Sequence, residues 1–329
     1  MAERLLDVRH LHTSFFTHLG EVKAIRDVSF HVDKSEIIGI VGESGSGKSV
    51  TSLSVMGLLA HPGKVTEGEI LFKGEDLLKK KKREMRKIQG NQISMIFQDP
   101  MTSLNPLFTI GNQITEVLHT HNKMGRAKAN ERAVEMLRMV GIPSPEKRVR
   151  SYPHEFSGGM RQRAMIAMAL SSEPDLLIAD EPTTALDVTI QAQVLALMKE
   201  LNERLGTATI LITHNLGCAS SICDRILVMY GGKIMEEGST EEIFYEPRHP
   251  LYHGSVKFRS EGQRRTVQAE TGSHSGNAAG YASSAYGMPL LSQMQICGEG
   301  LRFHGSAGIP AERNPSGQLF QMPPRCSCK

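Results

Sequence analysis

The chain has 329 residues, 40% of them hydrophobic, and a formal net charge of +3. This length leaves room for one large domain or two smaller ones, and the mild charge argues against a nucleic-acid-binding protein. Five cysteines form neither a disulfide framework nor a zinc spacing, which fits a reducing compartment. No apolar run approaches the ~18 residues of a membrane span, and the N-terminus lacks the apolar core of a signal peptide. We therefore expect any work at a membrane to go through a partner.

The N-terminal region is predicted to form β-strands. Residues 4–10 and 22–32 are rich in apolar and β-branched side chains, and a turn at residues 18–20 separates them. Phe15 falls between these strands, upstream of a glycine-rich loop. An aromatic ring at this place can stack on an adenine, although packing in the core is the simpler interpretation.

Residues 42–49 read GESGSGKS and match the pattern G-x-x-x-x-G-K-[ST] of a phosphate-binding loop. Residues 36–41 before the loop predict a buried strand, and residues 50–59 after it predict a helix closed by Pro-Gly. Glycines let the backbone wrap closely around phosphates, and N–H groups at a helix N-terminus favour anions. Lys48 would contact the β- and γ-phosphates and Ser49 would ligate Mg²⁺. A glycine-rich turn with a chance lysine does not require this strand–loop–helix context, so we expect nucleotide binding.

Two features follow before the chain becomes helical. Residues 79–83 are five consecutive cations, which we interpret as a solvated face rather than a nucleic-acid or lipid patch. Residues 91–97 predict a strand that ends at Gln98. Apolar residues at helical spacing then predict helices over residues 110–121 and 126–140.

An acidic pair follows a second short apolar strand. Ser157 precedes two glycines and is predicted to cap a helix over residues 158–170. Residues 176–179 predict a buried strand with Asp180 and Glu181 at its C-terminal end, where ligands bind in open α/β sheets. The alternative, a solvated acidic turn, fits poorly in a chain that also carries a phosphate loop.

The following segments keep alternating. A predicted helix over residues 190–205 leads to a strand over residues 209–213, which ends at His214. A hairpin over residues 226–235 and a capping box at residues 239–242 come next. This alternation predicts a mostly parallel α/β sheet.

The motifs resemble, in order and spacing, the nucleotide-binding subunits of ABC transporters across residues 4–250. The set comprises the loop at residues 42–49, Gln98, Ser157-Gly158-Gly159, Asp180-Glu181, Ala185-Leu186-Asp187 and His214. Residues 95–100, 156–163 and 179–189 look like the ATP-binding subunits of bacterial oligopeptide and dipeptide importers. Nickel importers of the same branch are the alternative.

The resemblance implies an α/β fold of the P-loop NTPase class, ABC type. It implies a RecA-like core with an N-terminal antiparallel β subdomain and an inserted helical signature subdomain at about residues 100–170. The nucleotide-binding domain would span residues 4–250, and residues 251–329 would form a divergent, largely irregular tail. Gln318 stands in this tail where the family has a cysteine, so we predict no iron–sulfur cluster there.

The resemblance also assigns roles to the polar residues. Asp180 would hold Mg²⁺ through water, because a hard cation prefers oxygen ligands. Glu181 would orient or deprotonate the attacking water, and His214 would contact the γ-phosphate. Gln98 would touch Mg²⁺ or the water and couple the site to a membrane partner. The metal set is therefore Ser49, Gln98 and Asp180.

A second group would act between subunits. Ser157 and Gly159 would close on the γ-phosphate bound by the opposite subunit, and Asp187 would lie across the dimer interface. The implied nucleotide-binding set is Phe15, Gly42, Glu43, Ser44, Gly45, Ser46, Gly47, Lys48, Ser49, Val50, Ser157, Gly158, Gly159 and Asp187.

The implied function is hydrolysis of ATP, with Mg²⁺, to drive import of oligopeptides or dipeptides at the cytoplasmic face of a bacterial membrane. The implied partners are two transmembrane permease subunits, a second ATPase subunit in a hetero- or homodimer, and indirectly an extracytoplasmic binding protein. No nucleic-acid partner is expected. The alternatives are a nickel or other small-solute importer, a soluble ABC-type ATPase, and a non-catalytic regulator. Intact Lys48, Asp180, Glu181 and His214 argue against a regulator.

Overall fold

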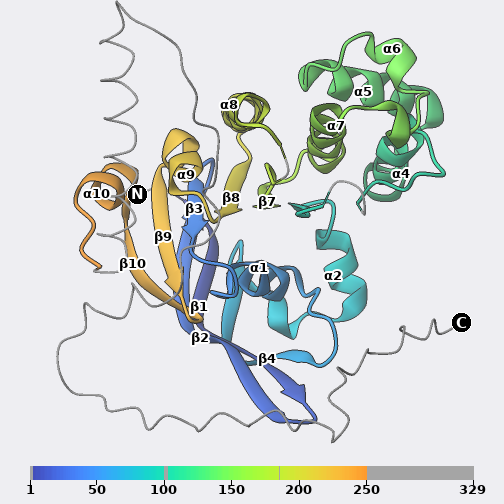
Figure 1. Ribbon diagram of the computed structural model, residues 1–329. Coiled ribbons are helices and arrows are strands. Elements are labelled where there is room, and N and C mark those ends of the chain that lie inside the picture. Colours follow the sequence, from blue (N-terminus) through green and yellow to red (C-terminus); the bar gives the residue numbers. More distant parts are fainter. Residues whose placement is uncertain (1–2, 100–102, 185, 250–329) are drawn as a thin grey trace, which may run out of the picture. The chain divides into compact units, whose positions relative to one another are not determined.

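The computed structural model describes residues 3–99, 103–184 and 186–249 (Figure 1). These residues all fall within one compact unit of the chain, residues 1–271. Within them, no helix combines the length and the apolar character needed to cross a bilayer. The predicted irregular tail lies outside the described residues.

An antiparallel sheet is built mainly from the N-terminal region. Its order is β2 (Gly20–Asp33), β1 (Arg4–Thr17), β4 (Gly63–Phe72) and β5 (Glu75–Asp76). β1 pairs with β2 on one edge and with β4 on the other, both antiparallel. The strands predicted over residues 4–10 and 22–32 are confirmed as β1 and β2. β1 is longer than expected, because it continues through Phe15 to the turn.

A six-stranded sheet forms the centre of the fold. Its strands are, in sheet order, β10 (Lys233–Ser239), β9 (Arg225–Tyr230), β3 (Ile37–Val41), β8 (Ala208–Thr213), β7 (Leu176–Asp180) and β6 (Ile93–Ile96). All neighbours are parallel except β10, which returns antiparallel from β9 as the predicted hairpin. β3, β7 and β8 are buried along their whole length, as expected for parallel strands covered on both faces.

The helices divide between the two faces of this sheet and an inserted subdomain (Figure 1). They are α1 (Lys48–Met56), α2 (Lys82–Ile88), α4 (Ile110–Asn122), α5 (Arg126–Met139), α6 (Pro145–Arg148), α7 (Gly158–Leu170), α8 (Val188–Leu205), α9 (Leu216–Ile222) and α10 (Thr240–Tyr245). Helices α4 to α7 form the inserted helical subdomain. The predicted mixture of antiparallel subdomain, parallel core and helical insertion is thus confirmed.

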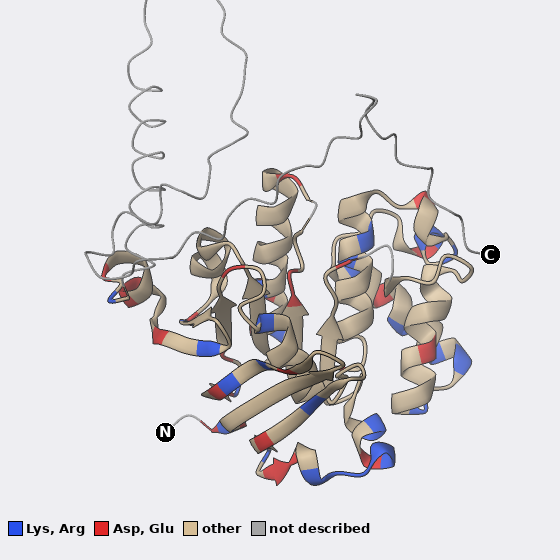
Figure 2. Cartoon of the chain, turned by 60° about the horizontal axis from the view of Figure 1, so that its bottom comes forward, with Lys and Arg blue, Asp and Glu red and all other residues tan. Residues whose placement is uncertain are grey.

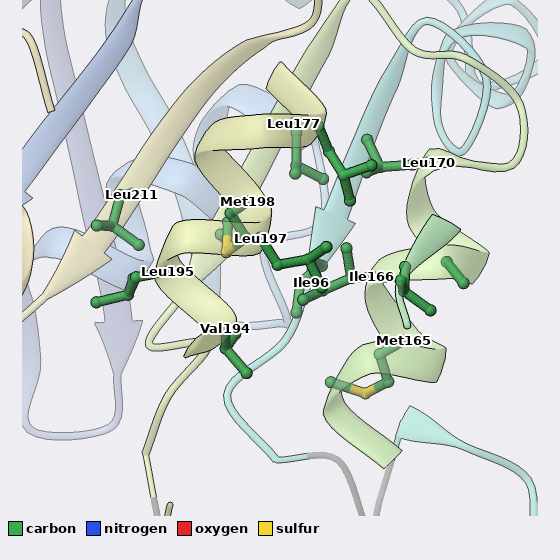
Figure 3. Close-up of a cluster of buried hydrophobic side chains, with 14 of the residues drawn as sticks. Ile96, Met165, Ile166, Leu170, Leu177, Val194, Leu195, Leu197, Met198 and Leu211 are labelled. Carbon is green, nitrogen blue, oxygen red and sulfur yellow. The ribbon is translucent and has the colours of Figure 1, made fainter. Parts of the chain in front are cut away.

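Successive residues of the central strands pack into two different cores. On β7, Leu177 and Ala179 join a cluster with α5, α7, α8 and α9, whereas Leu176 and Ile178 join a cluster with α1 and the antiparallel sheet. Figure 3 shows the first cluster, with side chains of α7 and α8 meeting those of β6 and β7. Burying each such side chain contributes about 1.5–3 kcal/mol. This core fixes the start of α7 relative to the sheet.

The structure corrects the predicted end of the first helix. α1 ends at Met56 because Gly57 adopts a left-handed conformation with φ 64°, and its N–H bonds the carbonyls of Leu53 and Ser54. The Pro-Gly pair that was expected to close the helix instead lies at the entry to β4, which begins at Gly63.

Three short helices, α2, α6 and α9, were not predicted, because four to seven residues are too few to show a helical period. Helix α2 begins within the cationic run. Its lysines and arginines are exposed, and Lys79 and Lys80 pair with Asp76 and Glu75. Figure 2 shows where the basic and acidic residues lie along the ribbon. A charged, solvent-facing surface is what the run was expected to form.

Candidate nucleotide-binding and hydrolysis site

The glycine-rich loop connects β3 to α1 and depends on two glycines. Gly47 caps α1 with φ 103°, a conformation that other residues rarely adopt. At Gly42 a Cβ would lie only 2.2 Å from the carbonyl oxygen of Met229. The loop can therefore run close to β9 only because these positions lack side chains. Within the loop, Glu43, Ser44 and Gly45 are exposed and Ser46 is buried.

Lys48 lies inside the loop. Its Nζ donates to the carbonyl oxygens of Gly42, at 2.8 Å, and Glu43, at 2.7 Å, and the residue is only 5% exposed. Burial lowers the pKa of Lys48, partly offset by the charges of Glu181 and Asp180. The Lys48 ammonium group is thus held by two loop carbonyls. A phosphate oxygen bound in the loop could take their place as its hydrogen-bond acceptor.

A hairpin braces the loop from outside. The N–H of Gly232, in the β9–β10 turn, donates to the carbonyl of Ser46 at 2.9 Å. The carbonyl of Gly232 accepts from the N–H of Arg26 on β2 at 2.8 Å. The hairpin was predicted from sequence, but its contact with the loop was not, because more than 180 residues separate them.

Ser49 and Asp180 meet beside the loop. The Ser49 hydroxyl donates to Asp180 Oδ1 at 3.1 Å, and Asp180 is 6% exposed. Burial and the nearby Glu181 raise the pKa of Asp180 against the opposing effect of Ser49. A hydroxyl and a carboxylate oxygen side by side fit Mg²⁺, which uses one or two protein oxygens and completes its shell with water and phosphate. Among the residues that the structure describes, no group of three or more His, Cys, Asp or Glu side chains could hold a metal ion.

Three predicted catalytic residues come together at the carboxyl ends of β6, β7 and β8. Gln98 Nε2 donates to Glu181 Oε2 at 3.1 Å, and His214 Nδ1 lies 3.1 Å from Glu181 Oε1. Gln98 therefore contacts the glutamate rather than Ser49 or Asp180. The Glu181 backbone is left-handed, with φ 47°, a strain of about 1–3 kcal/mol that commonly marks functional sites.

A third side-chain partner of Glu181, Thr184, was missed by the sequence analysis. Its hydroxyl donates to Glu181 Oε2 at 2.8 Å, shorter than either of the other contacts. Burial alone would raise the pKa of Glu181, but hydrogen bonds from His214 and Thr184 and the charge of Lys48 lower it below the ordinary glutamate value. The sequence feature that could have revealed this contact is a threonine three residues after an acidic residue in a turn.

The Ser157-Gly158-Gly159 motif lies elsewhere. Ser157 caps α7, accepting from the Met160 N–H at 3.3 Å, and at Gly159 a Cβ would lie 2.9 Å from Ile190 of α8. Figure 1 shows α7 apart from α1, so the motif does not join the phosphate loop of its own chain. Asp187 is exposed and caps α8, accepting from Ile190 N–H at 2.9 Å.

Two predicted nucleotide contacts pack against other parts of the protein. The half-buried Phe15 ring lies over Gly63, where a Cβ would come within 2.8 Å of a ring carbon. Val50, in the first turn of α1, packs partly buried against the core shared with the antiparallel sheet. Their roles toward nucleotide remain predictions.

A glycine loop between a parallel strand and a helix, acids at the end of a neighbouring strand and an inserted helical subdomain define a P-loop ATPase of the ABC class. The family model described as "ABC transporter" matches residues 25–184. The chain is 60% identical to the oligopeptide transport ATP-binding protein OppD of Bacillus subtilis (strain 168), covering 76% of this chain and 70% of that protein. It is 55% identical to the dipeptide transport ATP-binding protein DppD of Lactococcus lactis subsp. cremoris, covering 77% and 72%.

Solved structures agree. The dimeric, post-hydrolysis ATP-binding cassette MJ0796 bound to ADP and Pi has a TM-score of 0.65 at 27% identity, covering 72% of this chain and 99% of that one. CbiO1 from Clostridium perfringens has a TM-score of 0.66 at 25% identity, covering 82% and 98%. The chain therefore belongs to the ATP-binding subunits of ABC transporters, and ATP is its nucleotide.

Proposed function

We propose that this chain hydrolyses ATP to energise import of oligopeptides or dipeptides through a membrane permease. The observation that carries the catalytic part is the Glu181 carboxylate, held by Gln98 and His214 beside the Ser49–Asp180 pair. The relatives cited above are named for oligopeptide or dipeptide transport, which favours peptides over nickel as cargo.

The geometry supports a direct route to hydrolysis. Phosphate oxygens would replace the carbonyls that now accept from Lys48, and the ammonium would stabilise charge on the transferred group. Mg²⁺, bound by Ser49 and Asp180, would neutralise phosphate charge. Glu181 would accept a hydrogen bond or proton from the attacking water, because its lowered pKa keeps it ionised.

The remaining parts require partners. Ser157 and its glycines lie at an exposed helix N-terminus away from the loop of their own chain, which suits a role on the nucleotide of a second ATPase subunit. We propose that Asp187 lies at that same interface. We also propose that Gln98 couples the site to two permease subunits. The chain would then act peripherally at the cytoplasmic face of the membrane, with residues 4–250 as the nucleotide-binding domain and about residues 100–170 as its helical subdomain.

The test combines capture and uptake. The full chain, tagged and isolated from membranes in mild detergent, should bring two multi-span permeases and a second ATPase subunit. Cells lacking the chain should lose uptake of a labelled dipeptide or oligopeptide, and the wild-type chain should restore it while Glu181→Gln does not. Recovery of the chain alone, with ATP hydrolysis intact and peptide uptake unchanged, would contradict the transport role.

A further inference from the structure

The Glu181 carboxylate has three side-chain partners, which differ in how firmly they are placed. Gln98 is exposed on the segment after β6, and the His214 side chain is 60% exposed after β8. Both approach from other strands, at 3.1 Å. Thr184 belongs to the same turn as Glu181 and makes the shortest contact, at 2.8 Å.

The turn itself is closed and anchored. The Thr184 N–H donates to the Glu181 carbonyl at 3.1 Å, and the Glu181 N–H donates to Ile212 on β8 at 2.9 Å. The preceding Thr183 is buried, and its hydroxyl accepts from Gln191 of α8 at 2.9 Å. Thr184 is therefore tied to Glu181 within one closed turn, whereas Gln98 and His214 reach the carboxylate from separate segments of the chain.

We propose that Thr184 is a positioning residue that holds the Glu181 carboxylate in its working orientation while Gln98 and His214 exchange partners during the ATP cycle. This inference rests on the proposed function of ATP hydrolysis. Bound ATP would offer Gln98 and His214 new partners in its phosphates, metal and water. The hydroxyl of Thr184 donates to Oε2, so Oε1 would be the oxygen left to face the water if His214 turned to the phosphate.

A variant that keeps the turn but lacks the hydroxyl isolates this contact. A valine at position 184 has nearly the shape of threonine and keeps the turn but cannot donate.

The test compares Thr184→Val with Thr184→Ser in the full chain together with the partners that co-purify with it. Thr184→Val should lower kcat for ATP hydrolysis by about tenfold, since one hydrogen bond to a charged group is lost. The Kd for a fluorescent ATP analogue should stay within about twofold, because Thr184 does not touch the phosphate loop. Thr184→Ser should recover most of the kcat.

A second readout, the Tm of each variant, separates positioning from simple loss of structure. Thr184→Val should lower kcat while its Tm and Kd stay near the wild-type values, and Thr184→Ser should match the wild type in all three. Thr183→Val is the matched control: it removes the bond to Gln191 in the same turn, so it should lower Tm while kcat stays near the wild-type value.

A wild-type kcat in Thr184→Val would overturn the inference. So would equal damage by valine and serine, because the hydroxyl would then not matter. These results leave the proposed function intact as long as the wild-type chain hydrolyses ATP. A wild-type chain that does not hydrolyse ATP would refute the proposed function and, with it, the positioning role.

Discussion

Two regions of this chain are predicted to contact nucleotide, and they differ in whether residues of the same chain surround them. Around the phosphate loop, Lys48 donates to loop carbonyls, Ser49 donates to Asp180, and Glu181 has three side-chain partners. At the start of α7, Ser157 satisfies only its own helix and faces solvent. The first region is assembled within the chain, whereas the second presents an exposed helix N-terminus, which we propose acts on the nucleotide of a second subunit. Under this proposal, mutations in the first region act on the chain's own nucleotide and mutations in the second act on a neighbour's.

The largest effect should follow loss of the carboxylate in the first region. Glu181→Gln keeps the side-chain shape but cannot accept a proton, so ATP hydrolysis should fall by about 100-fold or more while ATP still binds. Steady-state phosphate release and nucleotide titration measure the two effects. Glu203→Gln, at an exposed position on α8, is the matched control and should retain activity. Hydrolysis by Glu181→Gln at the native rate would mean that another group serves as the base.

Removing the ammonium should weaken nucleotide binding in the same region. Lys48→Ala leaves the carbonyls of Gly42 and Glu43 without their donor and removes a charged contact to phosphate, so ATP affinity should fall by about 10- to 100-fold. Equilibrium titration with a fluorescent ATP analogue measures it. Lys199→Ala, on α8 away from the loop, should bind ATP as the wild type does. Unchanged affinity in Lys48→Ala would show that the buried ammonium does not meet phosphate.

The second region should behave in the opposite way. Ser157→Arg places a bulky cation at the α7 N-terminus, so ATPase activity of the assembled complex should fall by about tenfold. ATP affinity of the isolated chain should stay within about twofold, because α7, which Ser157 caps, lies apart from α1 and its phosphate loop (Figure 1). A loss of affinity as large as in Lys48→Ala would erase the distinction between the two regions.

The smallest effect concerns stability. Because burial raises the pKa of Asp180, the folded state binds its proton more tightly than the unfolded state does. The ionised carboxylate therefore costs stability above the folded-state pKa, and this cost disappears as the pH falls below the unfolded value near 3.8. Asp180→Asn should raise the Tm of the ATP-free chain by about 2 °C at pH 7.5, and less at a pH near the unfolded value of 3.8.

Calorimetry at the two pH values checks this prediction. Asp175→Asn is the control, since Asp175 pairs with Lys73 at the surface and its loss should lower Tm slightly. A lower Tm for Asp180→Asn at pH 7.5 would show that the Ser49 hydrogen bond and the Lys48 charge outweigh burial.

Much of the fold is determined by short stretches of sequence. The phosphate loop, the Ser157 and Ser239 caps and the β9–β10 hairpin depend on residues within a few positions of one another. Their geometry follows from local hydrogen bonding and backbone preference, so the motifs predicted them. The short helices α2, α6 and α9 were missed because they have too few turns to show a period.

The candidate site was only partly readable in the same way. The sequence named Lys48, Asp180, Glu181 and His214, but not their partners. That Gln98 contacts Glu181 rather than Ser49, and that Gly232 braces the loop, depend on parallel strands brought together by long crossovers. Even Thr184, three residues from Glu181, was missed, because its contact requires the left-handed backbone at Glu181. Local motifs determine which chemical groups are available, whereas packing of distant strands decides which of them touch, since such contacts have no local signal in the sequence.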